Sequence, residues 1–303
     1  MAAVIPIHSG MKTIKLFLIL ALLALGPTAC DNEALKGTLK ISITDAPIDS
    51  KNIKSVNIFF KNLEASQNGS WKSFKNFEQP VGVNLMSYTG GKSFLLIDQF
   101  TNPGEFQQLR MDLNIANRNS SLIVNPQSNI EFIDGSTQPI YMKEGLEPQL
   151  IVDAQFGIAS RGLTDITLDL DLRKSIRKND AGEFVLEPVI RVLNTFDTGS
   201  IRADVINTTT EKVVVYVYKQ GAFNSSELQS GNGISFPNAI SSASLANDKV
   251  QVGFLSSDSY DLIFVKLAED GTVLDVLGKK QNVEVTKGNV NEIQVDISAL
   301  SPS

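Results

Sequence analysis

Apolar and polar residues alternate in the chain over many short stretches, most clearly after Gly37. Leu39, Ile41 and Ile43 share one side of this first stretch, and polar residues occupy the other side. A period of two residues is typical of a half-buried β-strand. Pro47 ends the stretch, because proline has no amide hydrogen to donate to a sheet.

The same period recurs along the whole chain and predicts many short strands. The turns between them are rich in Gly, Pro, Asn and Asp, and Asn68-Gly69 predicts a hairpin because both residue types tolerate a positive φ. Single helical turns are expected at 83–88 and 173–178. After the first strand, the predicted strands are 56–60, 93–100, 109–115, 122–124, 130–133, 139–142, 149–158, 164–172, 184–193, 200–206, 212–218, 249–255, 260–267, 272–277, 281–285 and 289–297.

The strand pattern pauses at 194–198 and starts again at Gly199. A chain of 303 residues also favours two domains over one. We therefore predict an all-β fold of two antiparallel β-sandwich domains in tandem, residues 37–193 and 199–303, joined by a linker at 194–198. Residues 221–247 form a long predicted loop, and loops of that length are often functional or mobile.

A short apolar run precedes the only cysteine, Cys30. Lys12 and Lys15 come before the run at 16–25, and small residues fill 26–29. This is the layout of a secretory signal, expected to start at Met11, and the run is shorter than the roughly 20 residues of a membrane-spanning helix. Because the small residues end at Cys30, the segment resembles a bacterial lipoprotein signal, although Pro27 stands where an aliphatic residue is usual.

This resemblance implies that residues 1–29 are removed, that Cys30 carries lipid and that residues 30–36 form a tether to the outer membrane. The alternative is secretion with a free thiol. Asp31 and Glu33 resemble an export signal of Bacteroidetes-like lipoproteins, which implies display at the cell surface. A merely solvated linker is the simpler interpretation of these acidic residues.

Removal of residues 1–29 changes which chemistry is available. Lys12 and Lys15 are lost, so the net charge moves from −6 to −8, which argues against nucleic acid as a partner. The only histidine, His8, is also lost. Catalysis by Ser-His-Asp or Cys-His groups is thereby excluded, as are metal sites built on His or Cys. We expect no cofactor.

Six motifs follow one another in the first predicted domain. They are Gly37-Thr-Leu-Lys-Ile-Ser-Ile-Thr-Asp-Ala-Pro47, Gly69-Ser-Trp71, Val83-Asn-Leu-Met86 with Gly90-Gly91, Asn102-Pro-Gly-Glu-Phe-Gln-Gln-Leu-Arg110, Asp169-Leu-Asp-Leu-Arg-Lys-Ser-Ile176 and Leu186-Glu-Pro-Val-Ile-Arg191. In this order they resemble the domain of unknown function 4382 family, common in lipoproteins of Bacteroidetes-like bacteria. The family has no established activity, so the resemblance implies a boundary and a fold class for 37–193 and no mechanism. Residues after 199 are similar only in style to transthyretin-like or immunoglobulin-like modules.

Three aspartates are the candidate metal ligands. Asp165, Asp169 and Asp171 project from one face of the strand predicted at 164–172, and calcium takes oxygen ligands of this kind. The spacing lacks the glycine-bearing loop of an EF-hand, so we expect a solvated polar face instead. Paired carboxylates could also hydrolyse glycosides, but the sequence singles out no pair.

Aromatic residues are the candidate ligand-binding groups. Trp71 and Phe77 would share one face of a strand and could grip a sugar, while Phe74 would lie opposite, so core packing is the better interpretation. The most apolar strand of the second predicted domain spans 213–218. It is expected to be a buried central strand, and an edge that adds a partner's strand is the alternative.

Two function classes remain. The first is a non-enzymatic surface lipoprotein that binds a protein or a glycan through its loops. The alternative is a structural or anchor subunit of a fimbria-like surface assembly. A carboxylate-based glycoside hydrolase comes third.

Overall fold

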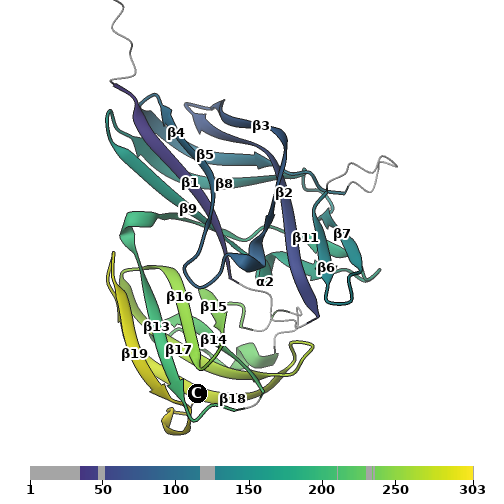
Figure 1. Cartoon of the computed structure of the whole chain (residues 1–303), viewed down its shortest axis with the longest axis vertical. Coiled ribbons are helices and arrows are strands. Elements are labelled where there is room, and N and C mark those ends of the chain that lie inside the picture. Colours follow the sequence, from purple (N-terminus) through teal and green to yellow (C-terminus); the bar gives the residue numbers. More distant parts are fainter. Residues whose placement is uncertain are drawn as a thin grey trace, which may run out of the picture.

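The computed structural model describes residues 35–46, 52–116, 127–209, 211–229, 234 and 236–302. Cys30, the predicted signal segment and the strand predicted at 122–124 lie outside the described residues. Among those that are described, no helix is long and apolar enough to cross a membrane. The strands form two sets of sheets, one in each half of the chain (Figure 1).

The first half pairs a four-stranded sheet with a larger one. The four-stranded sheet has the order β12 (Ile190–Asn194), β9 (Leu163–Asp171), β1 (Gly37–Ala46) and β4 (Phe94–Thr101). The larger sheet has the order β10 (Ile176–Lys178), β11 (Phe184–Leu186), β7 (Thr137–Met142), β6 (Asn129–Phe132), β2 (Ile53–Gln67), β5 (Gly104–Asp112) and β8 (Gln149–Ile158), with β3 (Ser70–Asn84) paired to β2. Two short helical turns are η2 (Leu85–Ser87) and α2 (Leu172–Ser175).

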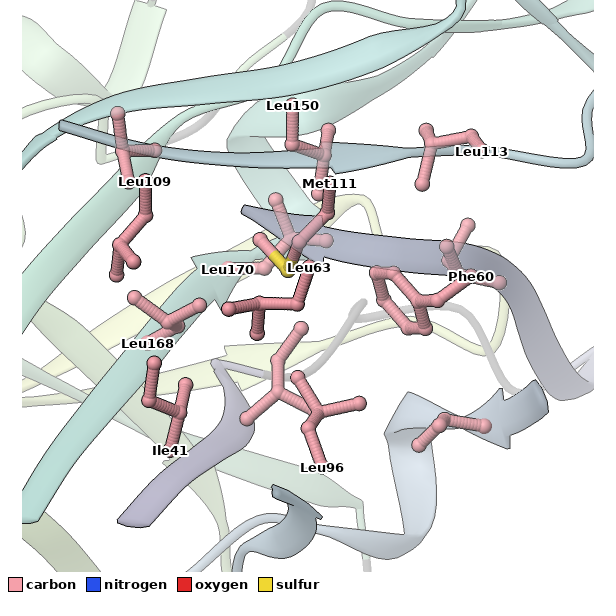
Figure 2. Packing of buried hydrophobic residues seen from close by; sticks show 14 of the residues in the cluster. Ile41, Phe60, Leu63, Leu96, Leu109, Met111, Leu113, Leu150, Leu168 and Leu170 are labelled. Carbon is pink, nitrogen blue, oxygen red and sulfur yellow. The ribbon is translucent and has the colours of Figure 1, made fainter. Parts of the chain in front are cut away.

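The core of the first half lies between these two sheets. Figure 2 shows Ile41 of β1 and Leu168 of β9 on one side of it, with Leu63 of β2 and Met111 of β5 on the other. The alternation after Gly37 predicts this core, and its apolar side chains are fully buried. Their removal from water is the main favourable term in the folding of this half.

The second half contains two smaller sheets. One has the order β16 (Lys249–Ser256), β13 (Thr198–Ile206) and β19 (Val290–Asp296). The other has the order β15 (Ser241–Ser244), β14 (Lys212–Lys219), β17 (Asp258–Leu267) and β18 (Val273–Val285). Three helical turns accompany them, namely η3 (Thr195–Asp197), η4 (Ser225–Gln229) and η5 (Ile297–Ala299).

Strand β14 is buried on both of its faces. Val213, Val215 and Val217 pack into one apolar cluster, while Tyr216 and its even-numbered neighbours pack into a second cluster with residues of the 221–247 segment. The prediction of a central buried strand is confirmed. The alternative, an edge open to a partner's strand, is wrong because β14 lies between β15 and β17.

The prediction of an all-β fold is confirmed, and the sheets are mostly antiparallel. Three neighbouring pairs are parallel instead, namely β1 with β9, β7 with β11 and β13 with β19. The predicted turn at Asn68-Gly69 is confirmed by φ angles of 52° and 75°. The predicted linker at 194–198 holds η3, and the division into two independently folding domains stays a prediction.

Several boundaries differ from the prediction for local reasons. Pro188 lies between β11 and β12, which the sequence pattern joins into one strand at 184–193. The strands predicted at 272–277 and 281–285 are one strand, β18, which bends at Gly278 with a φ of 137°. The predicted helical turn at 173–178 ends at Ser175 and continues as β10.

The substitution Leu168→Ala tests the importance of the first core. We expect it to lower the free energy of unfolding by about 2 to 5 kcal/mol, because Leu168 is fully buried and its removal leaves a cavity. Leu163→Ala, on the same strand at an exposed position, is the matched control and should change stability by less than about 0.5 kcal/mol. Urea unfolding followed by circular dichroism measures both. Equal losses for the two variants would contradict the assignment of the core.

Candidate functional site

The polar face of β9 is buried where it meets the second half of the chain. Asp169 is 3% exposed and Asp171 is 5% exposed, so the expectation of a solvated face is wrong at these two positions. The second half covers this end of the sheet, because Asp169 lines a small cavity together with Ser242 of β15 and Gly253 of β16. Sequence periodicity gives the faces of a strand but not what packs on them.

The three candidate calcium ligands have different partners. Asp165 accepts a hydrogen bond from the Thr195 hydroxyl at 2.8 Å, and Asp169 forms an ion pair with Arg191 of β12. The carboxylate of Asp171 lies 3.3 Å from the ammonium of Lys174. Within the described ranges, no group of three or more His, Cys, Asp or Glu side chains could hold a metal ion. The geometry therefore gives the calcium hypothesis no support.

Helix α2 carries the cations that contact the second half. The Arg173 guanidinium donates to the backbone carbonyl of Phe236 at 3.0 Å and lies 5.4 Å from the ring centre of Tyr216. The Lys174 ammonium donates to the carbonyl of Ala239 at 2.6 Å. We call this set of residues, with Asp171 3.4 Å from the Arg173 guanidinium, the joint.

Two carboxylates hold α2 in place. Asp171 is its N-cap and accepts from the backbone amide of Lys174 at 3.1 Å. Asp45, at the end of β1, accepts from the amide of Leu172 at 3.0 Å. Side-chain oxygens at these positions satisfy amides that a helix start leaves without partners. The family motifs at Asp45 and Asp171 therefore position the cations of the joint.

The 221–247 segment supplies the other side of the joint. Phe236 has a φ of 55° and stacks on Tyr216 at a ring separation of 4.0 Å. Glu227 of η4 is buried and accepts hydrogen bonds from the Tyr218 hydroxyl at 2.8 Å and from the Asn238 amide at 3.1 Å. These contacts fix the carbonyl of Phe236 where Arg173 reaches it.

The backbones of the two halves also touch directly. A Cβ atom on Gly253 would lie 2.3 Å from the Cα of Gly91, closer than any real contact, so strand β16 has no room for a side chain there. Gly90 and Gly91 have φ angles of 64° and 87°, which favour glycine. The Gly90-Gly91 motif is therefore a contact surface between the halves.

Beside the joint lies a cavity of about 10 Å³, lined by residues of both halves. Asp169 Oδ1 and Ser242 Oγ are buried and have no hydrogen-bond partner among the described residues. A space of this size and polarity accommodates one water molecule. Burial raises the pKa of Asp169 above its ordinary value, and this effect outweighs the opposing influence of Arg191. The arrangement suits a fixed contact between the halves.

The candidate aromatic residues do not form an open platform. Phe74 and Phe77 both pack against the first core, so the expectation that Phe74 lies on the opposite face from Phe77 is wrong. The pairing of β3 with β2 shifts register twice, and each shift changes the face that the following residues occupy. Trp71 lies beneath the Arg110 guanidinium, 4.3 Å from it.

A larger hollow lies at the far end of the second half. Its volume is about 300 Å³, and β18, β19 and the last described residues surround it. Lys279 lies on β18 beside it, and its amide donates to the carbonyl of Ser301 at 2.9 Å. Hydrogen bonds from Ser298 and Asn207 lower the pKa of Asp296 on the other wall. The lining is mostly polar and belongs to side chains that the sequence analysis did not single out.

The sequence signals that could have identified the joint were present but ambiguous. Asp45 was marked only as part of a family motif, and 173–178 predicted only a helical turn. Tyr216 and Phe236 gave no signal because their contact requires the folded loop.

The substitution Arg173→Ala tests the joint. We expect the free energy of unfolding to fall by roughly 3 to 5 kcal/mol, because Asp171 and the carbonyl of Phe236 lose a buried cationic partner. Arg202→Ala, which breaks an exposed ion pair with Glu292, is the matched control and should cost less than about 1 kcal/mol. Differential scanning calorimetry compares them. A loss for Arg173→Ala no larger than that for the control would refute the joint.

The raised pKa of Asp169 predicts a pH dependence. A carboxyl whose pKa is raised in the folded state contributes stability that is fully present below its unfolded pKa and is lost as pH rises through its folded pKa. The stability of the natural chain relative to Asp169→Asn should therefore be greatest below about pH 4 and should fall as the pH rises through the higher pKa of the folded chain. Urea unfolding at several pH values gives this difference. A difference that grows with pH would show that Arg191 dominates instead.

The solved structures that match this chain have low sequence identity to it and low TM-scores. No curated protein matches the chain. The matching structures include a minor pilin from Streptococcus agalactiae (10% identity, 86% of this chain and 94% of that one, TM-score 0.21). They also include a fimbrial protein from Bacteroides ovatus (11% identity, 89% and 50%, TM-score 0.22) and a leucine-rich repeat protein from Bacteroides thetaiotaomicron (11% identity, 89% and 27%, TM-score 0.19). The chain thus spans half or less of the last two, and TM-scores this low support no functional argument.

One family model matches the sequence itself. The model, described as "Domain of unknown function (DUF4382)", covers residues 36–188, which is just over half of the chain. The matched range includes β1 with Asp45, the Gly90-Gly91 turn and α2, so it contains the first half's side of the joint. The resemblance noted from the sequence motifs is confirmed, and the chain belongs to the DUF4382 family.

Proposed function

We propose that this protein is a non-enzymatic, lipid-anchored structural subunit or anchor of a surface assembly in the cell envelope. The observation that carries the proposal is the joint, which holds two β-sandwiches in one fixed arrangement. Contacts between domains of one chain ordinarily allow relative motion unless the interface is large and apolar. Buried cations also oppose such motion, because each one needs hydrogen-bond partners in fixed positions.

The joint has partners for its charges in one orientation only. Arg173 and Lys174 donate to carbonyls of Phe236 and Ala239, and a rotation of the halves would break both hydrogen bonds, which Asp171 alone does not replace. The backbones of Gly91 and Gly253 lie so close that a Cβ atom on Gly253 would clash, so the halves are in close contact at that point. A rigid pair of sandwiches is suited to transmitting force or holding a fixed distance, which a subunit of an assembly requires.

The anchor in this proposal is lipid on Cys30. Two or three acyl chains give stable membrane attachment, since each buried CH₂ contributes roughly 0.8 kcal/mol. The location is the outer membrane, with the folded part exposed at the cell surface. The net negative charge of the chain is unsuited to nucleic acid.

A binding module for a protein or a glycan is the second candidate function. The hollow between β18 and β19 favours it, because about 300 Å³ is the lower end of the range of ligand sites. Its mixed lining of amides, lysines and Asp296 can accept and donate hydrogen bonds to a polar ligand. No observation favours the glycoside hydrolase.

Chemical crosslinking of intact bacterial cells tests the proposal. For the natural chain, we expect a ladder of self-crosslinks or one fixed protein partner in the membrane fraction, because an assembly subunit has constant neighbours. The variant Cys30→Ala should leave the membrane fraction and lose the ladder. Gel sizing with mass spectrometry gives both results.

The remaining outcomes separate the alternatives. An uncrosslinked monomer in the membrane fraction would contradict the structural role and favour the binding module. Absence of the natural chain from membranes, or absence of acyl mass on Cys30, would contradict lipid anchoring. Arg173→Ala, which keeps Cys30, provides the matched control for the joint: it should stay in the membrane while the pattern of crosslinks changes.

A further inference from the structure

One row of residues crosses the outer face of the four-stranded sheet at its tip. Phe100 of β4 and Leu163 of β9 both pair with Thr38 of β1, one on each side. Residues in register on neighbouring strands share a face. Since Leu39 faces the core, this row lies on the opposite, outer face. We call Phe100, Thr38 and Leu163, together with Leu35, the tip row.

The apolar members of the tip row are exposed to solvent. Phe100 is 72% exposed, Leu163 is 48% exposed and Leu35, two residues before β1, is 52% exposed. Singly scattered apolar residues need no explanation, but adjacent ones mark an interaction surface. The tip row is therefore a candidate contact surface.

The outer face of the sheet changes character with distance from the tip. The next row holds Lys40 and Asp98, whose charged groups lie 3.3 Å apart at the surface. Farther along, Asp169 and Thr44 are buried under the second half. Leu95, which pairs with Ser42 beyond the Lys40 row, is a further exposed apolar side chain on this face, whereas the tip row places Phe100 and Leu163 in one register.

The position of Cys30 identifies the occupant. Only four residues separate Cys30 from Leu35, and a chain spans at most about 3.6 Å per Cα-to-Cα step, so the Cα of Cys30 lies within roughly 18 Å of the Cα of Leu35. Two cationic residues lie at the same tip, because the amide of Arg161 donates to the carbonyl of Lys36 at 3.0 Å. Cations near a bilayer are attracted to anionic headgroups.

We propose that the tip row docks into the headgroup region of the bilayer that holds Cys30. The proposal rests on the lipid anchoring under Proposed function. The end of the chain lies at the opposite end of the molecule from the tip, as Figure 1 shows. Docking at the tip therefore stands the first half on the membrane and points the second half away from it. A tether alone would leave the orientation free, whereas the docked row fixes it.

The test measures contact between the tip row and lipid without relying on native lipidation. The chain from Cys30 to Ser303 couples through its one thiol to maleimide lipids in vesicles that contain anionic phospholipid and brominated acyl chains. Trp71 is the only tryptophan, so a Trp71→Phe background lets Phe100→Trp report on the tip. Leu274→Trp, at an exposed position on β18, is the matched control.

We expect brominated lipid to quench Phe100→Trp fluorescence at least twofold and to leave Leu274→Trp unchanged. Equal fluorescence of Phe100→Trp in brominated and ordinary vesicles would overturn the docking. So would a dimer of the uncoupled chain, seen by sedimentation velocity, that Phe100→Asp dissociates, because the occupant would then be a second copy. Failure of native lipidation is scored separately, by the acyl mass on Cys30 in cells.

Discussion

The arrangement of this molecule depends on the burial of charge between its two halves. Arg173 and Lys174 can be buried only if carboxylate and carbonyl groups replace water as their hydrogen-bond partners. These groups come from both halves of the chain. The cost of an unpaired buried cation exceeds that of an unpaired hydroxyl or amide. The joint thus selects one orientation, although it adds little to stability beyond what an apolar contact of equal size would provide.

The outer face of the four-stranded sheet lies in three different environments along its length. At its tip the face is apolar and exposed, in its middle Lys40 pairs with Asp98, and at its far end Asp169 is buried beneath β15 and β16. The inner face is mostly apolar because it meets one core. The outer face varies because its environment changes from the proposed membrane, through solvent, to the second half.

The inner face is also the part that sequence patterns predicted well. Leu39, Ile41 and Ile43 recur every second residue, and the Asn68-Gly69 turn requires φ angles that few residues adopt, so each signal is local and has one physical explanation. The register of β3 was not predictable, because its irregular pairing with β2 depends on the partner strand. Parallel pairing of β1 with β9 joins residues more than a hundred positions apart, and no local pattern encodes it.

The joint was not predictable for a related reason. Asp169 and Asp171 have the spacing of a solvated face, and they would be solvated in a first half that stood alone, since the residues that cover them lie beyond the range of the family model. Within that range, Asp45 and Asp171 hold the amides of α2 and need nothing from the second half. Arg173 is different, because the carbonyl of Phe236 satisfies it only in the complete chain. The family fold therefore provides the platform, and Arg173 with Lys174 binds it to the rest of this protein.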